Sequence, residues 1–268
     1  MSEIQDLSSI KLRLACANKD AEESRAKISI TMAHQSSPST FGLVAGLGVG
    51  AGIFYYRSLV NAHVARGVSP SLLMVHADVR RVMGLATARK AHELAEYLTS
   101  LLQRLANGGA KIATIPAFSP QVCGEELAAR SPLPLINILD VIVDEIVRRR
   151  LQRIAIFGAR VTMETKLFGR LEDRADVIAP TAEEIDRLNE AYVRIVETER
   201  ASHEDYEMLR NLAHTLVERE RLDAILLAGT DFSFVFNSSN MDFPHLDGAR
   251  AHIDAIMNQI DLESRQGQ

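Results

Sequence analysis

The sequence is poor in cysteine and has no excess of positive charge. Among its 268 residues only Cys16 and Cys123 are cysteines. Two cysteines so far apart form neither a disulfide framework nor a cysteine-based zinc site, so we expect no metal and a reduced, cytoplasmic protein. The 30 Lys and Arg are outnumbered by 35 Asp and Glu, for a formal net charge of -5. This balance gives no support for a nucleic-acid partner.

Long hydrophobic runs are also absent. The longest apolar stretch, residues 41–56, is interrupted by glycines and is too short to span a bilayer, so no membrane partner is predicted. The first 40 residues have no apolar segment of a secretory signal, and residues 32–40 are polar and rich in Ser and Pro. We therefore predict a flexible N-terminal extension over residues 1–40. An arm that reaches over a partner subunit is the alternative.

From Phe41 onward, short apolar runs alternate with segments of helical period. The predicted strands cover residues 41–45, 72–76, 112–116, 133–138, 153–157, 176–179, 223–228 and 243–247. Strands joined through helices pair in parallel, so an α/β fold with parallel sheets is expected. We predict lobe 1 over residues 41–140 plus 248–268, and lobe 2 over residues 141–247.

Two strands in the two halves end alike. Residues 112–119 and 224–231 are apolar runs that end in a small residue, with a hydroxyl residue one or two positions later. Ligands of open α/β folds bind beyond the carboxyl ends of the strands. If the two lobes face each other, both strand ends lie at one interlobe cleft.

Several motifs occur in a recognisable order. They are Gly-Leu-Val-Ala-Gly-Leu-Gly-Val-Gly at 42–50, Tyr-Tyr-Arg at 55–57, Gly-Ala-Arg-Val-Thr-Met-Glu at 158–164, Leu-Ala-Gly-Thr-Asp at 227–231 and Leu-Asp-Gly-Ala-Arg-Ala-His at 246–252. This order resembles the aspartate/glutamate racemase superfamily, which includes hydantoin racemases, maleate isomerase and arylmalonate decarboxylase. The resemblance implies two pseudo-symmetric, flavodoxin-like lobes with the site in the cleft between them. It also implies amino-acid metabolism without a cofactor, and a homodimer.

The residues that define the chemistry of that superfamily are missing. Its members invert a weakly acidic Cα–H with one thiol on each face, since a thiolate can be tuned toward neutral pKa. The matching positions here are Ala117 and Gly229, neither of which accepts a proton. Phe118 replaces an Asn that helps to bind carboxylate in the superfamily. Cys123 lies six residues beyond Ala117 and is better explained as a buried structural thiol.

Some groups suited to binding a small carboxylate remain. The backbone amides of Leu47 and Gly48, in a glycine-rich turn that opens a helix, are suited to an anion. By resemblance, further groups that line the cleft are Ser119, Arg160, Thr162 and Thr230. For the hydroxyl residues, a role as helix cap or turn residue is an equal alternative.

Catalysis would need a base that is not a thiol. Asp231 matches the acidic residue that follows the second cysteine of the superfamily, and His252 matches a histidine on its last helix. His76 stands at the end of the second strand, and histidine is a competent acid and base near neutral pH. A purely structural role for this strand-end histidine remains the alternative.

Two functions follow from this sequence. The first is a cofactor-independent isomerase, lyase or decarboxylase that acts on a small carboxylate or amino-acid-like ligand, with His76 or Asp231 as base. The alternative is a non-catalytic ligand sensor or partner subunit on the same fold. Loss of the two thiols is compatible with both.

Overall fold

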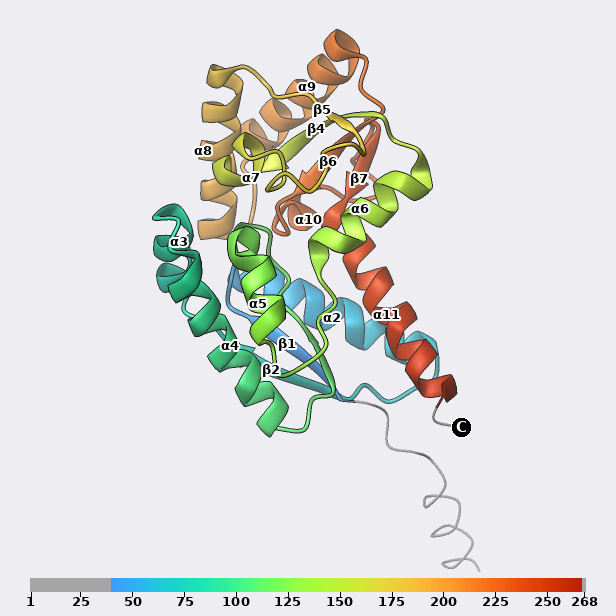
Figure 1. Ribbon diagram of the computed structural model, residues 1–268. Coiled ribbons are helices and arrows are strands. Elements are labelled where there is room, and N and C mark those ends of the chain that lie inside the picture. The colour runs from blue at the N-terminus through green and yellow to red at the C-terminus, as the bar shows by residue number, and fades with distance from the viewer. Residues whose placement is uncertain (1–39, 267–268) are drawn as a thin grey trace, which may run out of the picture. The chain divides into compact units, whose positions relative to one another are not determined.

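Two parallel sheets form the framework of the chain (Figure 1). The computed structural model describes residues 40–266, with side chains through residue 262. Both sheets belong to one compact unit, Ser39–Glu263. The extension predicted for residues 1–40 lies, apart from its last residue, outside the described residues, and the lobe boundaries stay a prediction.

The first sheet holds strands in the order β2-β1-β3. These strands are β1 (Phe41–Ala45), β2 (Leu72–His76) and β3 (Ile112–Thr114). The helices joined to this sheet are α2 (Val49–Ala65), α3 (Val79–Thr87), α4 (Ala91–Asn107), η1 (Ser119–Cys123), α5 (Gly124–Arg130) and α11 (Gly248–Gln266). All pairings are parallel, as the alternation of strands and helices predicts.

The second sheet has the order β5-β4-β6-β7 and is also fully parallel. Its strands are β4 (Arg153–Gly158), β5 (Asp176–Val177), β6 (Ala224–Ala228) and β7 (His245–Asp247). Its helices are α6 (Ile138–Arg149), α7 (Arg160–Glu164), α8 (Ala182–Thr198), α9 (His203–Glu220) and α10 (Phe232–Val235).

The prediction of a strand at residues 133–138 is wrong. Only a single bridge forms there, between Ala113 and Leu135. Pro134 has no N–H to donate, and Asn137 already caps α6 by accepting a hydrogen bond from Leu139 N at 2.8 Å. The bridge nevertheless sits beside β3, where a fourth strand would stand. Both lobes thus follow the flavodoxin-like order 2-1-3-4, in which ligands bind beyond the carboxyl ends of the first and third strands.

Apolar side chains cover both faces of the first sheet. Phe41 and Leu43 of β1 pack with Tyr55 and Leu59 of α2 and with the apolar face of α11. On the other face, Val44 packs with α3, α4 and α5. Burial on both faces explains why β1 reads as a continuous apolar run, and it fixes the loop after β1 relative to the sheet.

The start of α8 shows the local control that the sequence predicts. Thr181 Oγ1 accepts a hydrogen bond from Glu184 N at 3.3 Å, and Glu184 Oε2 accepts one from Thr181 N at 2.8 Å. This capping box satisfies two amides that the helix itself leaves unpaired. It fixes the point where the chain turns into α8, the helix that carries Tyr192.

Replacement of Thr181 by Ala is expected to lower the free energy of unfolding by about 1 kcal/mol, because the amide of Glu184 loses its acceptor. Urea unfolding measures the change. The control is Thr215→Ala within α9, where the hydroxyl bonds only the Asn211 carbonyl at 2.8 Å. A loss in the control as large as in Thr181→Ala would contradict the role of the cap.

Candidate functional site

A glycine turn follows β1 and opens α2. Gly46 and Gly48 have φ of 89° and 115°, a region that residues with a Cβ rarely adopt. Gly48 is the N-cap of α2 and offers no side chain, and the first turn of α2 contains no acidic residue. The positive end of this 17-residue helix therefore has no counter-charge of its own.

Lobe 2 supplies that counter-charge. Asp231, three residues beyond β6, is 1% exposed. A methyl group placed on Gly48 would lie 2.8 Å from Asp231 Oδ1 and 3.0 Å from Oδ2. A methyl group on Gly50 would lie 3.2 Å from Cγ of Glu199. The absence of a side chain at Gly48 lets the Asp231 carboxyl approach the N-terminus of α2, whereas the space at Gly50 is taken mainly by the ring of Phe234, whose Cε2 would lie 2.8 Å from a methyl group.

The carboxyl group of Asp231 is only partly hydrogen-bonded. Oδ2 accepts a hydrogen bond from the Tyr192 hydroxyl at 3.4 Å, and Oδ1 has no partner among the described residues. Burial raises the pKa of Asp231 to about 6, while the Tyr192 hydroxyl and the nearby amides of Asp231 and Ala51 partly offset this. Asp231 can therefore change protonation near neutral pH.

His76 lies at the other end of the same turn. It is exposed at the end of β2, and a methyl group on Gly46 would lie 2.8 Å from its Nδ1 and 2.7 Å from its Cε1. The fold thus brings His76 and Asp231, which are far apart in sequence, against the two glycines of one turn. Leu47, between those glycines, is partly buried.

A neighbouring side chain fills the space beside Gly229, which the resemblance matches to the second thiol. A methyl group on Gly229 would lie 2.4 Å from Cε2 of Tyr192 and 3.0 Å from its hydroxyl oxygen. Gly229 has no positive φ, so its backbone does not require glycine. The ring of Tyr192 therefore explains why a side chain is missing at residue 229.

Apolar packing surrounds Ala117, which the resemblance matches to the first thiol. Ala117 is 5% exposed and Phe118 is 3% exposed. Phe118 belongs to the core of lobe 2, and a methyl group on Gly248 would lie 2.7 Å from its Cζ. Phe118 therefore ties the end of β3 to the other lobe.

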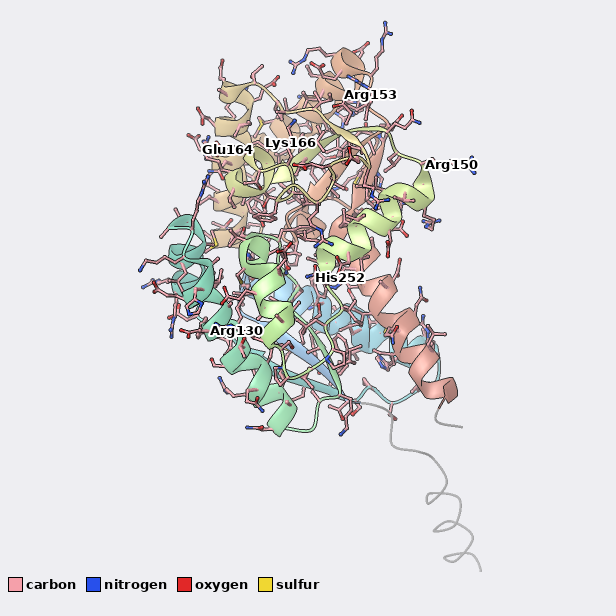
Figure 2. The ribbon with its side chains drawn as sticks, in the orientation of Figure 1. Arg130, Arg150, Arg153, Glu164, Lys166 and His252 are labelled. Atoms are coloured by element: carbon pink, nitrogen blue, oxygen red, sulfur yellow. The ribbon has the colours of Figure 1, made fainter. Side chains whose placement is uncertain are left out.

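His252 is fully buried, and both of its ring nitrogens have partners. Nδ1 lies 3.0 Å from the Tyr55 hydroxyl, and Nε2 lies 3.1 Å from Thr114 Oγ1 and 3.1 Å from the Ile136 carbonyl oxygen. Burial lowers the pKa of His252 to about 4, so it is neutral at physiological pH. Figure 2 shows it near the first turns of α11.

The hydroxyl residues and Arg160 have different surroundings. Thr162 in α7 is fully buried, and its Oγ1 has no hydrogen-bond partner among the described side chains and backbone. Thr230 is 2% exposed, and Ser119 is partly buried at the start of η1. Arg160 pairs with Glu164 and Asp186 within lobe 2, and its side chain is 42% exposed. The structure therefore does not bring Arg160 to the glycine turn.

Cys123 is buried and unreactive. Its thiol donates to the Pro120 carbonyl at 3.2 Å, and burial raises its pKa to about 12. The prediction that this thiol is buried is confirmed. Within residues 40–262, no group of three or more His, Cys, Asp or Glu side chains is arranged to hold a metal ion. No helix in the described part of the chain is long and apolar enough to cross a membrane.

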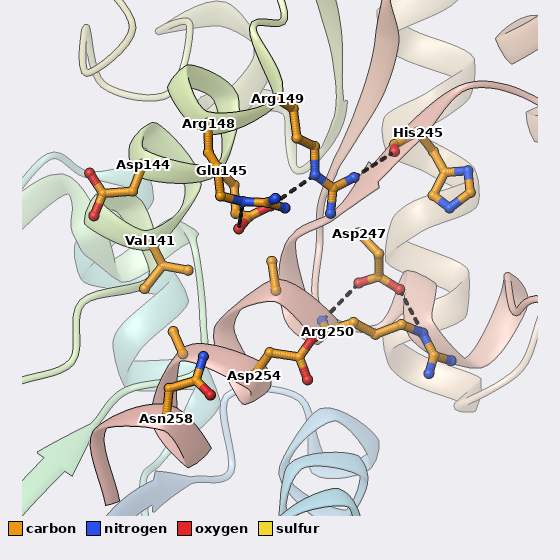
Figure 3. Close-up of a pocket in the computed structure, with 12 residues that line it drawn as sticks. Val141, Asp144, Glu145, Arg148, Arg149, His245, Asp247, Arg250, Asp254 and Asn258 are labelled. Atoms are coloured by element: carbon orange, nitrogen blue, oxygen red, sulfur yellow. Dashed lines mark hydrogen bonds and ion pairs between the residues drawn. The ribbon is translucent and has the colours of Figure 1, made fainter. Parts of the chain in front are cut away.

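A separate hollow of about 320 Å³ lies between α6, β7 and α11 (Figure 3). Its three arginines pair with acidic residues of the lining: Arg148 and Arg149 share Glu145, and Arg250 pairs with Asp247. Asp144 and Asp254 also line the hollow, so its acidic side chains outnumber its basic ones and it is poorly suited to an anion. It contains none of the residues predicted for the site.

Tyr192 is the site residue that the sequence does not reveal. In the sequence it is one apolar member of the amphipathic stripe of α8. Its place beside Gly229 and Asp231 depends on how α8 packs on the second sheet. The only local signal is that a glycine stands at residue 229 without a turn that needs one.

Two parallel sheets, with polar groups from both lobes at the carboxyl ends of their strands, define a two-lobed α/β protein. Residues 44–256 match the family described as Asp/Glu/Hydantoin racemase. The chain belongs to this family, as its motifs predict.

Solved structures confirm the fold. The chain is 21% identical to a candidate Asp/Glu racemase from Yersinia pestis, with a TM-score of 0.72 over 83% of this chain and 99% of that one. It is 18% identical to an aspartate racemase homologue from Pyrococcus horikoshii OT3, with a TM-score of 0.68 and the same coverages of 83% and 99%. A glutamate racemase from Francisella tularensis, in complex with D-glutamate, is 11% identical, with a TM-score of 0.59 and coverages of 84% and 82%. No curated protein matches the sequence significantly.

Replacement of Gly229 by Ala is expected to lower the free energy of unfolding by about 1–3 kcal/mol, because the new methyl group displaces the Tyr192 ring. Urea unfolding measures this. The matched control is Gly84→Ala within α3, where a methyl group meets nothing within 4 Å and helix propensity predicts a gain of roughly 0.5–1 kcal/mol. In a Tyr192→Ala background, Gly229→Ala should cost little. An equal loss in that background would contradict the steric explanation.

The buried carboxyl of Asp231 predicts a defined pH dependence of stability. Its pKa is raised from 3.8 to about 6 on folding, so the folded state binds more protons than the unfolded state between these values. Stability contributed by this group is complete below pH 4 and is lost as the pH rises to 6 and above, by about 3 kcal/mol. Asp231→Asn should therefore match the parent at pH 4 and exceed it in unfolding free energy at pH 7. Equal stabilities at both pH values would refute this.

Proposed function

We propose that this chain is a racemase-family enzyme that binds a small carboxylate or amino-acid-like ligand between its lobes. Asp231, rather than a thiol, moves a proton at the carbon next to the carboxylate. The main support for this proposal is the buried carboxyl of Asp231. One of its oxygens has no partner among the described residues, and it lies against the glycine turn of the other lobe.

The pKa of Asp231 suits a general base. A base works best when its pKa is near the working pH, and that of Asp231 is about 6. Oδ1 lacks a partner among the described residues, so it is the oxygen available for a proton in transit. Deprotonated Asp231 accepts the proton, and protonated Asp231 returns it.

The ligand carboxylate is assigned to the N-terminus of α2 and to Thr162. The first turn of α2 presents amides without an acidic residue of its own helix, and Thr162 Oγ1 has no partner among the described residues. Two carboxylates in one buried site repel each other unless one is protonated. Ligand binding therefore raises the pKa of Asp231 and takes up a proton, so proton abstraction uses the fraction of Asp231 that is still ionised in the complex.

His76 is the second proton-handling group of the proposal. It lies at the Gly46 end of the turn, and its side chain is exposed. We assign His252 to structure, because both of its nitrogens are engaged by Tyr55, Thr114 and Ile136. Arg160 is left out of the site because its charge is paired within lobe 2.

The proposed reaction is a cofactor-independent isomerisation, elimination or decarboxylation. Racemisation by two thiols is not part of the proposal, because the residues that the resemblance matches to the thiols are Ala117 and Gly229. Following the family resemblance, we further propose a homodimer in the cytoplasm, with a role in amino-acid metabolism.

A non-catalytic ligand sensor is the second candidate, and one observation favours it. Phe118, next to Ala117, is buried in the core of lobe 2, and the ring of Tyr192, which is partly buried, covers Gly229. A cleft that has been repacked in this way is compatible with binding that is not followed by reaction.

The test is NMR in D₂O with both enantiomers of aspartate and glutamate, with hydantoins and with small dicarboxylates. If the chain is an enzyme, we expect exchange of a Cα proton, or turnover, for at least one of these compounds. The rate should fall by about 100-fold or more in Asp231→Asn, because general-base catalysis supplies that order of acceleration. Binding should weaken with rising pH above 6, approaching about tenfold per pH unit for one proton taken up, and this dependence should vanish in Asp231→Asn.

The matched control is Asp247→Asn. Asp247 is also a buried carboxyl with a raised pKa, but it lies beside Arg250 and not at the glycine turn. The Asp247→Asn substitution should leave the rate of proton exchange and the pH dependence of binding unchanged. Binding without exchange or turnover across the panel would support the sensor, and no binding at all would overturn both functions.

A further inference from the structure

Gly229 and Tyr192 form a matched pair. The backbone of Gly229 is not in the left-handed region, yet even a methyl group there would meet the Tyr192 ring at 2.4 Å and 2.8 Å, and its hydroxyl oxygen at 3.0 Å. The space beside the strand end is thus filled from α8 instead of from β6. A phenol hydroxyl occupies the surroundings in which a thiol at residue 229 would stand.

The ring of Tyr192 is held in this position. It packs against Phe232 with ring centroids 4.9 Å apart, and Phe232 is itself fully buried. With Gly229 on one side and Phe232 on another, the hydroxyl group is directed to Asp231 Oδ2 at 3.4 Å. Packing therefore decides which oxygen of Asp231 is engaged and which stays without a partner.

We propose that Tyr192 is the positioning residue of Asp231: its hydroxyl holds Oδ2 so that Oδ1 faces the glycine turn, in place of the thiol that residue 229 lacks. This inference rests on the proposed function. Tyr192 acts through Asp231 and does not itself transfer the proton. It stays protonated, because burial and the charge of Asp231 hold its pKa well above the usual value.

The other charged groups around Asp231 do not replace this contact. Glu199, at the end of α8, raises the pKa of Asp231. The amides of Asp231 and of Ala51 in α2 lower it, and His76 lies at the opposite end of the turn, against Gly46. Tyr192 is the side chain that donates a hydrogen bond to this carboxyl among the described residues.

The experiment compares Tyr192→Phe with the parent by following the Asp231 side-chain carboxyl in ¹³C NMR as the pH is varied. Loss of the donor destabilises the carboxylate, so the pKa of Asp231 should rise, by about half a unit to one unit for one weak hydrogen bond to a charged group. The upper pH limit of ligand binding should move upward by the same amount.

Tyr206→Phe is the matched control. The Tyr206 hydroxyl donates to the Asn240 carbonyl at 2.8 Å, and its ring packs against Phe236 with centroids 5.8 Å apart, so its environment is similar but does not include Asp231. It should lower stability without moving the Asp231 titration. Gly229→Ala, which pushes the Tyr192 ring aside, should raise the pKa of Asp231 as Tyr192→Phe does.

The outcomes separate this inference from the proposed function. An unchanged Asp231 titration in Tyr192→Phe overturns the positioning role, even if ligands bind and exchange. A raised pKa with no ligand binding in any variant leaves the Tyr192–Asp231 contact standing and refutes the function built on it. A shift of equal size in Tyr206→Phe would overturn the inference as well, since the effect would then be general.

Discussion

The contact between the Asp231 carboxyl and the glycine turn of the other lobe is the interaction on which the site depends. The turn needs glycine at Gly46 and Gly48 for its backbone, and the missing side chain at Gly48 leaves room for the Asp231 carboxyl from lobe 2. The N-terminus of α2 attracts negative charge that its own first turn does not supply. The Asp231 carboxyl thereby forms a contact between the two lobes, and its pKa is about 6.

Burial of Asp231 brings its pKa close to neutral pH, which suits proton transfer. The same burial lowers the stability of the folded state at neutral pH. A carboxyl that is 1% exposed loses its hydration, which raises its pKa to about 6 and makes the ionised form unfavourable in the folded state. The opposite case is His252, which burial keeps neutral and which links α2, β3 and α11 through hydrogen bonds. The two buried titratable groups thus have different roles. Asp231 has an oxygen without a partner among the described residues, whereas both ring nitrogens of His252 have partners.

The absence of both thiols is accompanied by repacking on each side of the site. Phe118 passes from the end of β3 into the core of lobe 2, and Tyr192 covers Gly229. The ring that covers Gly229 also brings a hydroxyl group to Asp231.

The alternation of apolar runs and helical segments determined the parallel α/β fold, and the spacing of the glycines and the absence of the two thiols were legible in the sequence itself. The sequence did not show that no full strand forms near Pro134, because this depends on the missing N–H of Pro134 and on the capping of α6 by Asn137. Only the tertiary structure decided that Tyr192 covers Gly229 and that Asp231 faces α2. These contacts join residues far apart in the chain, and side-chain packing between elements, which no local pattern records, sets their distances.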